Sequence, residues 1–286
     1  MGNEFSVLML VYGGDRPEHF DAALRSIAAQ TLPPAEIVLV VDGPVPEGTE
    51  EVIRKYGEEL APSAIAFRVI RSEKNLGCGG AKRLGFGECR YPLIAMMDAD
   101  DLSVPDRFEK QVRYFSEHPE VAVAGGFITE FVSAEDPTDI SVRAGSRKVP
   151  ETDAEIREYI KTRCPMNHVT VMLKKDETAA AGGYLDEYYQ NEDYHLWIRM
   201  ALAGCRFGNL PCNLVNVRVG QEMYRRRGGW KYFKSEAGLQ KLMLSRKLIR
   251  FPRYLVNIGK DLCCRSCCRT GSGAGYSGSS RGSKRK

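Results

Sequence analysis

The chain has 286 residues, of which 43% are apolar and 27% are charged, and its net charge is +4. This length and balance are typical of a soluble protein with one large domain and a substantial core. No run of about 18 apolar residues is present, which argues against a transmembrane helix.

The charge is distributed unevenly along the chain. Residues 246–286 contain eleven Lys or Arg residues and one acid, Asp261, whereas residues 1–245 contain 30 bases and 36 acids. The body of the protein therefore carries a net charge of −6, and the basic C-terminal segment is expected to be a separate unit.

The N-terminus and the cysteines bear on location. The first residues, MGNEFSVLMLVYGG, lack a basic segment followed by a cleavage site, so no signal peptide is expected. Five cysteines are scattered singly, which is typical of reduced, intracellular thiols. These five are Cys78, Cys89, Cys164, Cys205 and Cys212. The other four lie in CCRSCC, which has neither the spacing nor the histidine partners of a zinc site.

Short β-rich runs alternate with helical patterns through the first half of the chain. Phe20 and Leu24 recur at helical spacing, as do Phe108 and Val112. The expected strands span residues 5–12, 36–41, 64–70, 92–97 and 121–125. This alternation predicts βαβ units with right-handed crossovers and an α/β fold with a mostly parallel sheet.

After residue 126 the pattern is less regular. Gly204 is expected to end one of the helices in this part. Strands are expected at 128–133 and 169–175, and helices at 153–163, 192–204 and 230–249. Residues 270–286 are rich in Gly, Ser and basic residues and are expected to be disordered.

Acidic residues follow one of the buried-looking strands. The apolar run Leu93–Met97 continues into Asp98, Asp100 and Asp101, and an earlier strand ends in Asp42. Ligands of open parallel sheets collect beyond the carboxyl ends of the strands, and carboxylates suit Mg²⁺ or Mn²⁺ bound to a diphosphate. A cation that bridges Asp100 and a diphosphate would relieve the repulsion among these acids. The alternative is that they are turn residues, or that Asp101 caps the next helix.

A glycine-rich loop, NLGCGG at 75–80, precedes a helix that contains Lys82 and Arg83. Backbone N–H groups at a helix N-terminus attract anions, so this loop is a candidate contact for phosphates. The alternative is a flexible turn before a surface helix. The sequence has no P-loop and no GxGxxG after the first strand, which argues against those two modes of nucleotide binding.

A second group of acids lies at the start of an expected helix. Asn191 is positioned to cap this helix, and Glu192 and Asp193 fall in its first turn. The structural alternative is that both acids only complement the helix dipole. In the functional alternative, one of them is a general base that accepts a proton from a hydroxyl. His168, in HVTVM, is more typical of a structural histidine than of a ligand.

Taken together, these segments resemble family 2 glycosyltransferases of the GT-A fold. The resemblance spans residues 5–230. Within the family, the sequence is similar to bacterial enzymes that build exopolysaccharide, capsule or O-antigen repeat units. The motifs that carry it, in order, are SVLMLVY, SIAAQT, EIVLVVDG, NLGCGGAKRLG, MMDADD, PMNHVTVM, GGY and NEDYHLW, followed by YRRRGG. The fold implied is a Rossmann-like, nucleotide-binding α/β domain with a mostly parallel central sheet flanked by helices.

The resemblance divides the chain into parts. Residues 1–230 form the GT-A domain, with a nucleotide-sugar-binding half at 1–126 and an acceptor-binding half at 127–230. Residues 231–269 form an amphipathic, basic helical extension, and residues 270–286 form the disordered tail.

The resemblance also implies an inverting transfer of a sugar from a nucleotide-sugar to an acceptor hydroxyl. Asp193 is then the catalytic base, and Glu192 supports it or touches the acceptor. Asp100 ligates a divalent cation, Mn²⁺ or Mg²⁺, and Asp98 contacts the donor ribose or a water on that cation. The other donor-binding residues implied are Val11, Tyr12, Asp42, Asn75, Arg83, His168, Arg226 and Arg227.

Two positions depart from the family pattern. Val41 stands where many members carry the first of two acids, which bears on the role of Asp42 in base recognition. Arg83 stands where Asn is common, which bears on the phosphate contacts of its helix.

The basic C-terminal segment has the pattern of an amphipathic helix. Five apolar residues fall on one helical face, and four bases lie nearby. The apolar residues are Phe251, Tyr254, Leu255, Ile258 and Leu262, and the bases are Arg250, Arg253, Lys260 and Arg265. This pattern, with the lipid-linked acceptors usual in the family, predicts binding to a membrane surface. The alternative is a helix packed on the body of the protein.

The expected donor is a nucleotide-sugar, with UDP favoured over GDP, that carries a hexose or an N-acetylhexosamine. The expected acceptor is a glycan or a polyprenyl-diphosphate-linked glycan at the cytoplasmic face of the membrane, and no nucleic-acid partner is expected. One alternative is a catalytically inactive nucleotide-sugar or glycan-binding module. Another is a phosphotransferase with Asp98 as nucleophile, which is disfavoured because Leu102 follows the acids where that chemistry needs a Ser/Thr-bearing motif.

Overall fold

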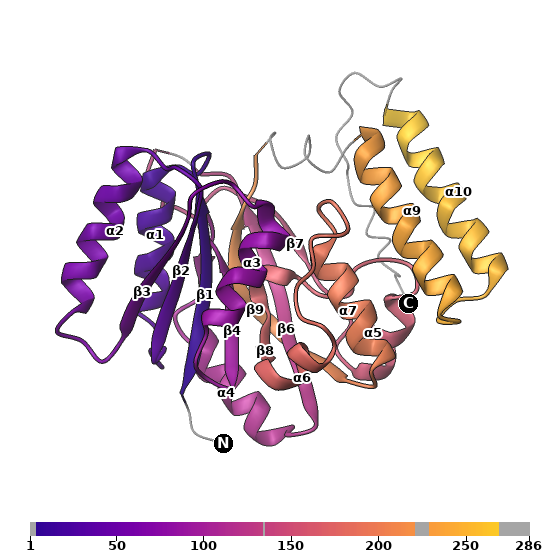
Figure 1. Cartoon of the computed structure of the whole chain (residues 1–286), viewed down its shortest axis with the longest axis horizontal. Helices are drawn as coiled ribbons and strands as arrows, with labels where there is room; N and C mark the ends of the chain where they lie inside the picture. The colour runs from indigo at the N-terminus through magenta and orange to yellow at the C-terminus, as the bar shows by residue number, and fades with distance from the viewer. Residues whose placement is uncertain (1–3, 134, 221–228, 269–286) are drawn as a thin grey trace, which may run out of the picture.

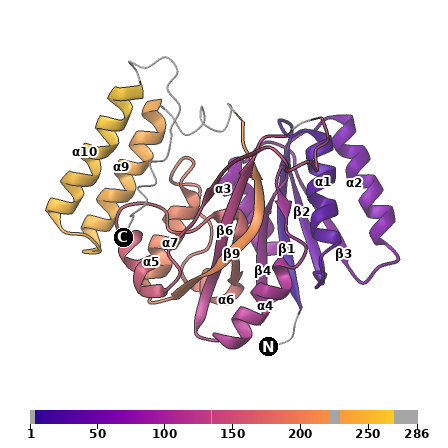
Figure 2. The same ribbon diagram turned by 180° about the vertical axis from the view of Figure 1, so that it is seen from behind.

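The computed structural model describes residues 4–133, 135–220 and 229–268, those from 261 onward as helix backbone only. In these residues the chain forms one mixed nine-stranded sheet with helices packed on both faces (Figures 1 and 2). The α/β prediction is confirmed.

Four parallel strands form the first half of the sheet. They are β1 (Phe5–Tyr12), β2 (Glu36–Asp42), β3 (Ala66–Ser72) and β4 (Leu93–Asp98), in the spatial order β3-β2-β1-β4. The register pairs Tyr12 with Asp42 and Leu10 with Asp98. The carboxyl ends of these strands therefore meet at one edge, as the alternation of strands and helices predicted.

The second half of the sheet is mixed. Its strands are β5 (Leu102–Ser103), β6 (Val121–Phe131), β7 (Arg143–Arg147), β8 (Met172–Lys174) and β9 (Arg206–Arg218). Strand β8 enters antiparallel between β4 and β6, and β9 pairs parallel with β6 and antiparallel with β5. Strand β6 replaces two shorter predicted strands and runs across residue 126, so the two halves share one sheet.

Two apolar layers cover opposite faces of the sheet because alternate strand residues point to opposite sides. Val7 and Met9 contact the layer of α1 (Pro17–Ala28), α2 (Glu47–Leu60) and α4 (Arg107–Glu117). Leu8 contacts the layer that includes α3 (Gly77–Glu88) and α7 (Glu192–Leu202). The two candidate acidic motifs are thereby placed around one face of β4.

Shorter elements complete the second half of the chain. Helix α5 (Asp153–Tyr159) begins with a capping box in which Thr152 and Glu155 bond each other's backbone, and α6 (Lys175–Ala180) follows β8. A 3-10 turn at His168–Thr170 occupies the first part of the strand expected at 169–175. His168 is the first residue of this turn, which lies just before β8.

The C-terminal extension is a helical hairpin of α9 (Gly229–Ser245) and α10 (Phe251–Cys268). It lies at the end of the molecule opposite α1 and α2 (Figures 1 and 2). The buried Asn257 amide donates to Gln240 Oε1 at 2.7 Å and to the Lys161 carbonyl at 2.8 Å, so α10 is bonded to both α9 and the body. Residues 270–286, predicted to be disordered, lie outside the described residues.

Candidate active site

Three acids follow β4, and the structure gives them different environments. Asp98 is exposed, Asp100 is half-buried, and Asp101 is 3% exposed. The Asp101 carboxylate accepts a hydrogen bond from the Arg218 backbone N–H at 2.8 Å, and the Arg218 guanidinium donates to the Asp100 carbonyl at 2.8 Å. Asp101 therefore ties this loop to β9, while Asp98 and Asp100 are the acids that solvent can reach.

The three carboxylates form a region of concentrated negative charge. Burial raises the pKa of Asp101, and the charges of Asp100 and Asp98 raise it further. A charge concentration of this kind attracts a cation.

A buried arginine lies beneath these acids and was not predicted from the sequence. The side chain of Arg107 is fully buried, and its guanidinium donates to Gln111 Oε1 at 2.9 Å and to the Met96 carbonyl at 2.8 Å. Burial lowers the pKa of Arg107 to about 9, against the opposing influence of Asp98 and Asp101. Its position at the start of an amphipathic helix gave no sign that it would be buried, since arginine is mostly exposed.

The ends of β1 and β2 lie beside the end of β4. Tyr12 is 38% exposed at this edge, whereas Val11 is buried. Asp42 is also buried, and its Oδ1 accepts a hydrogen bond from the Leu76 backbone N–H at 2.6 Å. Asn75 donates from its amide to the Asp42 carbonyl at 3.3 Å. Asp42 and Asn75 therefore hold the loop before α3, whatever they contribute to a nucleotide.

The glycine-rich loop is shaped by packing at two positions. Gly77 has φ +75°, and Asn75 Oδ1 accepts a hydrogen bond from its N–H at 3.0 Å. A Cβ atom on Gly79 would lie 3.2 Å from both the Leu185 carbonyl oxygen and Asp186, so glycine there permits close approach of the 185–186 segment. The loop thus brings α3 against the chain that leads to α7.

Lys82 and Glu192 meet in the interior of the site. The Lys82 ammonium lies 2.9 Å from Glu192 Oε1, and the two residues are 5% and 8% exposed. Burial alone would raise the pKa of Glu192, but Lys82 and the Cys78 thiol lower it to about 2. Arg83, the predicted donor contact on the same helix, is exposed. The side chain of Lys82 therefore lies inside the candidate site, whereas that of the adjacent Arg83 lies on the surface.

His168 belongs to a buried aromatic group. Its Nε2 lies 3.0 Å from the hydroxyl of Tyr184, and its ring lies 6.2 Å from that of the buried Trp197. Burial and the nearby Lys82 lower the pKa of His168 well below its usual value, so the ring is neutral at physiological pH. Tyr184 comes from the GGY motif, which was recognised, although no role was assigned to its tyrosine.

Asp193 lies in the first turn of α7, next to this group. Its Oδ1 accepts a hydrogen bond from the Tyr194 backbone N–H at 2.7 Å, and the Cys164 thiol lies 3.7 Å from its Oδ2. Burial raises the pKa of Tyr184, and the negative charges of Asp193 and Glu192 raise it further. Asp193, Glu192, Lys82, Tyr184 and His168 therefore surround one region.

The capping prediction for Asn191 is wrong. Asn191 is the N-cap of α7 by position, but its side chain makes no capping hydrogen bond. Its amide instead donates to Ser235 Oγ of α9 at 3.2 Å and to the Tyr189 carbonyl at 3.4 Å. Tertiary contact with α9 therefore replaces the local bond. Arg226 and Arg227, the remaining predicted donor contacts, lie outside the described residues.

The residues present fit a divalent cation held in part by its substrate. No group of three or more His, Cys, Asp or Glu side chains in the described ranges is arranged to hold a metal by itself. Mg²⁺ and Mn²⁺ are commonly bound through one or two carboxylates, substrate phosphates and waters. Asp98 and Asp100 provide that number of carboxylates at the edge of the sheet where ligands collect.

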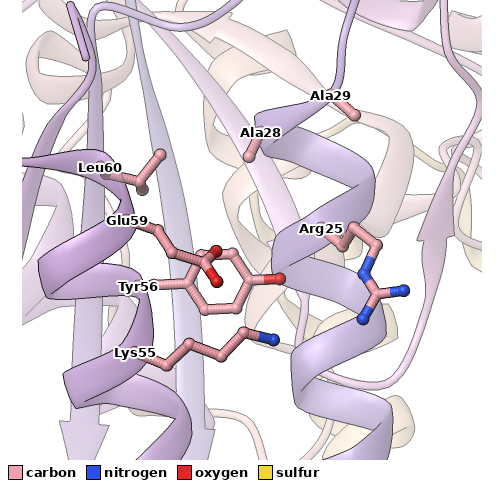
Figure 3. A pocket seen from close by; sticks show the side chains of 7 residues that line it. All are labelled: Arg25, Ala28, Ala29, Lys55, Tyr56, Glu59 and Leu60. Atoms are coloured by element: carbon pink, nitrogen blue, oxygen red, sulfur yellow. The ribbon is translucent and has the colours of Figure 1, made fainter. Parts of the chain in front are cut away.

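A separate hollow lies between α1 and α2 (Figure 3). Lys55 donates to Asp21 Oδ1 at 2.6 Å and Tyr56 donates to the Asp21 carbonyl at 3.1 Å. The residues that line it are Arg25, Ala28, Ala29, Lys55, Tyr56, Glu59 and Leu60. These bonds join the two helices, so we assign the hollow to helix packing.

Acid is expected to destabilise the protein through His195 of α7. Burial, and then Arg199, lower the pKa of His195 to about 4 from 6.5, so the unfolded chain binds the extra proton first as the pH falls. Stability is therefore lost between pH 6.5 and pH 4, by up to about 3 kcal/mol at about 1.4 kcal/mol per pKa unit.

Urea unfolding at pH 7 and pH 4.5 measures this loss. His195→Gln should show a smaller difference between the two pH values than wild type. His118→Gln is the control, because the His118 side chain is 46% exposed. An equal pH dependence in all three proteins would contradict the assignment.

Comparison with known proteins identifies the family. Residues 6–177 match the model of the family described as glycosyl transferase family 2. The amylovoran biosynthesis glycosyltransferase AmsE of Erwinia amylovora is 38% identical over 249 residues, which are 87% of this chain and 89% of that protein. An Escherichia coli protein, UDP-Gal:alpha-D-GlcNAc-diphosphoundecaprenol beta-1,3-galactosyltransferase, is 33% identical over 89% of this chain and 88% of its own length.

Solved structures agree on the fold. TarS 1–349 of S. aureus in complex with UDP-GlcNAc has a TM-score of 0.60 at 16% identity and covers 91% of this chain and 71% of that one. The mannosyltransferase PcManGT of Pyrobaculum calidifontis, in complex with GDP-Man and Mn²⁺, has a TM-score of 0.61 at 16% identity and covers 94% and 76%. The predicted GT-A fold and the predicted enzyme class are confirmed. The chain belongs to glycosyl transferase family 2 and is a glycosyltransferase.

Proposed function

We propose that this enzyme transfers a hexose or an N-acetylhexosamine from a UDP-sugar to a glycan hydroxyl, with inversion, in polysaccharide synthesis. One observation carries the proposal: Lys82 is paired with Glu192, the neighbour of Asp193, and the negative charge of Asp98 also raises the pKa of Lys82. The acids after β4 and the acids of α7 therefore face the same region. A donor held at the first group presents its sugar to the second.

The chemistry proposed is a single displacement. The acceptor hydroxyl attacks the anomeric carbon while Asp193 accepts its proton, and the bond from that carbon to the UDP oxygen breaks. The electron pair of the broken bond leaves with UDP, and the new glycosidic bond has the opposite configuration. This role requires an ionised Asp193, and the N-terminus of α7 favours a negative charge there.

Asp100 and Asp98 would hold Mn²⁺ or Mg²⁺ together with the donor diphosphate. When bound, the cation supplies Lewis-acid stabilisation of the negative charge on the departing diphosphate. Tyr12, Val11 and Asp42 line the adjacent strand ends, where the nucleoside would lie. His168 is neutral, so its role would be to position the hydroxyl of Tyr184 near the sugar and not to supply a positive charge.

Calorimetric titration with UDP and with GDP, each with Mn²⁺ or with EDTA, tests the donor. We expect UDP to bind in Mn²⁺ at least tenfold more tightly than GDP, and the heat of binding to disappear in EDTA. The UDP choice is supported by the UDP-Gal named for the Escherichia coli relative and by the UDP-GlcNAc bound in TarS. Binding of GDP alone would overturn the choice of a UDP-sugar as donor, and equal binding of UDP in EDTA would overturn the metal dependence. UDP binding without sugar transfer would indicate the inactive binding module.

We further propose a lipid-linked acceptor, reached at a membrane surface through the α9–α10 hairpin. The acceptor class is supported by the diphosphoundecaprenol named for the Escherichia coli relative. On α10, Phe251, Leu255 and Val256 are 58%, 53% and 50% exposed. Tyr254, expected on the same face, packs against the core of the body, and Val256 is exposed in its place. Among the described residues no helix has the length and apolar character to span a bilayer.

Vesicle sedimentation tests the hairpin. Exposed bases on α10, Arg253 and Lys260, would each contribute about 1 kcal/mol near anionic lipid. We expect binding to vesicles with anionic lipid, and at least tenfold weaker binding when Phe251 and Leu255 are both changed to Ser. Val132→Ser, at an exposed apolar position on another part of the surface, should bind like wild type. Equal binding by all three proteins would exclude this face.

A further inference from the structure

The ion pair of Lys82 and Glu192 joins two distant parts of the chain. Lys82 lies in the second turn of α3, and Glu192 is the first residue of α7. Their charged atoms are 2.9 Å apart, and both residues are more than nine-tenths buried. Helix α3 leads from the β3 strand end, whereas α7 carries the proposed base. The pair therefore spans from the donor half of the site to the acceptor half.

Stability gives a weak reason for this pair. Desolvating two charges offsets most of their attraction, so apolar residues of similar size commonly stabilise a core as well or better. Lys82 is also close to Asp98, and its ammonium lies 5.9 Å from the centre of the Tyr184 ring. A buried cation among the groups of the reaction site points to a role in the arrangement of that site.

The start of α7 depends on tertiary contacts. The Asn191 side chain makes no capping bond, and its Nδ2 donates to Ser235 Oγ and to the Tyr189 carbonyl. Gln190 just before it has φ +59°, a left-handed conformation that is uncommon outside glycine. The first turn is held by Asn191 toward α9 and by Glu192 toward α3. Asp193 follows directly after these two anchors.

We propose that Lys82 is a positioning residue, which fixes Glu192 and thereby aims Asp193 at a donor held by Asp98 and Asp100. This inference rests on the proposed role of Asp193 as base. Without Lys82, the buried Glu192 carboxylate loses its cation and retains the neutral Cys78 thiol as a neighbour, so it turns toward water or takes up a proton. Either change moves the first turn of α7. Binding of the nucleotide, at the strand ends, is left intact.

The test compares variants of the full chain in two measurements. UDP binding is followed by calorimetry. Transfer is followed as UDP release from UDP-galactose, UDP-glucose and UDP-N-acetylglucosamine, with GlcNAc-diphosphate on a short synthetic lipid as acceptor. Lys82→Met should lower kcat about 100-fold, the scale expected for a displacement of about 1 Å, and leave the Kd for UDP within about twofold. Lys74→Met, at an exposed position before the same helix, should leave both values unchanged.

Three further variants separate positioning from a general structural role. The kcat of the double variant Lys82→Met/Glu192→Gln should be about the same as that of the slower of the two single variants, Lys82→Met and Glu192→Gln. Each of these changes removes the same ion pair, so their effects should not add. Lys82→Arg, which retains the charge, should recover part of the activity. The double variant leaves no unpaired buried charge, so it reports on the pair even if Lys82→Met does not fold.

Several results would overturn the inference. They are a wild-type kcat for Lys82→Met, additive losses in the double variant, or weaker UDP binding at unchanged kcat, which would make Lys82 a donor contact. Failure of the proposed function looks different, because Asp193→Asn in the same assay would then transfer sugar normally. In that case Asp193 is not the base, whatever Lys82 does.

Discussion

Asp193→Asn is expected to reduce sugar transfer by about 10²–10⁴-fold, or about 3–5 kcal/mol of transition-state stabilisation, because a positioned general base contributes that much. The amide has nearly the same shape as the carboxylate but cannot accept the acceptor's proton at neutral pH. Its oxygen can still accept the hydrogen bond from the Tyr194 backbone N–H. The fold and the binding of UDP should therefore be retained.

The measurement is the initial rate of UDP release with acceptor present, alongside calorimetry of UDP in Mn²⁺. Asp176→Asn is a matched control, since Asp176 is an exposed acid in the first turn of α6 and lies outside the proposed site. A normal rate for Asp193→Asn would show that another group takes the proton. A loss of UDP binding in that variant would instead place Asp193 among the donor contacts.

Asp100→Asn is expected to abolish metal-dependent binding of UDP. A neutral amide is a poorer ligand for Mn²⁺ or Mg²⁺ than a carboxylate. We expect Kd for UDP in Mn²⁺ to rise at least tenfold, about 1.4 kcal/mol, so that the heat of binding approaches the absence expected for wild type in EDTA. The Asp100 carbonyl still accepts from Arg218, so the loop should keep its conformation.

Asp101→Asn separates the metal role from the structural one. The Asp101 carboxylate is buried and accepts from the Arg218 N–H, which an amide oxygen can also do. This variant is therefore expected to bind UDP with the metal dependence of wild type, with any loss appearing in the free energy of unfolding. The same UDP affinity for Asp100→Asn and wild type would remove Asp100 from the metal site. Greater loss in Asp101→Asn than in Asp100→Asn would exchange their roles.

The resemblance located the acidic motifs and implied roles for Asp98 and Asp100, yet it assigned no role to Asp101. Asp98, Asp100 and Asp101 all follow the same apolar run, but Arg218 of β9 bonds the side chain of Asp101 and the backbone carbonyl of Asp100. Arg218 lies in a strand of 13 residues that was not predicted. Its sequence, RFGNLPCNLVNVR, contains Gly, Pro and three Asn residues, which strands disfavour. Hydrogen bonds to β6 stabilise this segment as a strand, although its residues have a low intrinsic preference for that conformation.

The same distinction applies at helix starts. Asn191 has the residue type and position of a cap, and a local pattern can show no more than that. Its side chain bonds to Ser235, 44 residues later, because α9 lies there. Lys82 and Arg83 are likewise adjacent bases on one helix, and the 100° step between them buries one and exposes the other.

The sequence by itself determined the alternation of strands and helices in the first half of the chain, the edge of the sheet where ligands collect, and the motifs from which the site is built. These follow from local patterns, since side-chain alternation, helical periodicity and apolar runs act over a few residues. The tertiary structure decided which residue of each motif faces the site. It buried Arg107 beneath the acids, paired Lys82 with Glu192 and placed Tyr184 against His168. Those contacts join segments that are far apart in the chain, and only the packing of the two helix layers on the sheet brings them together.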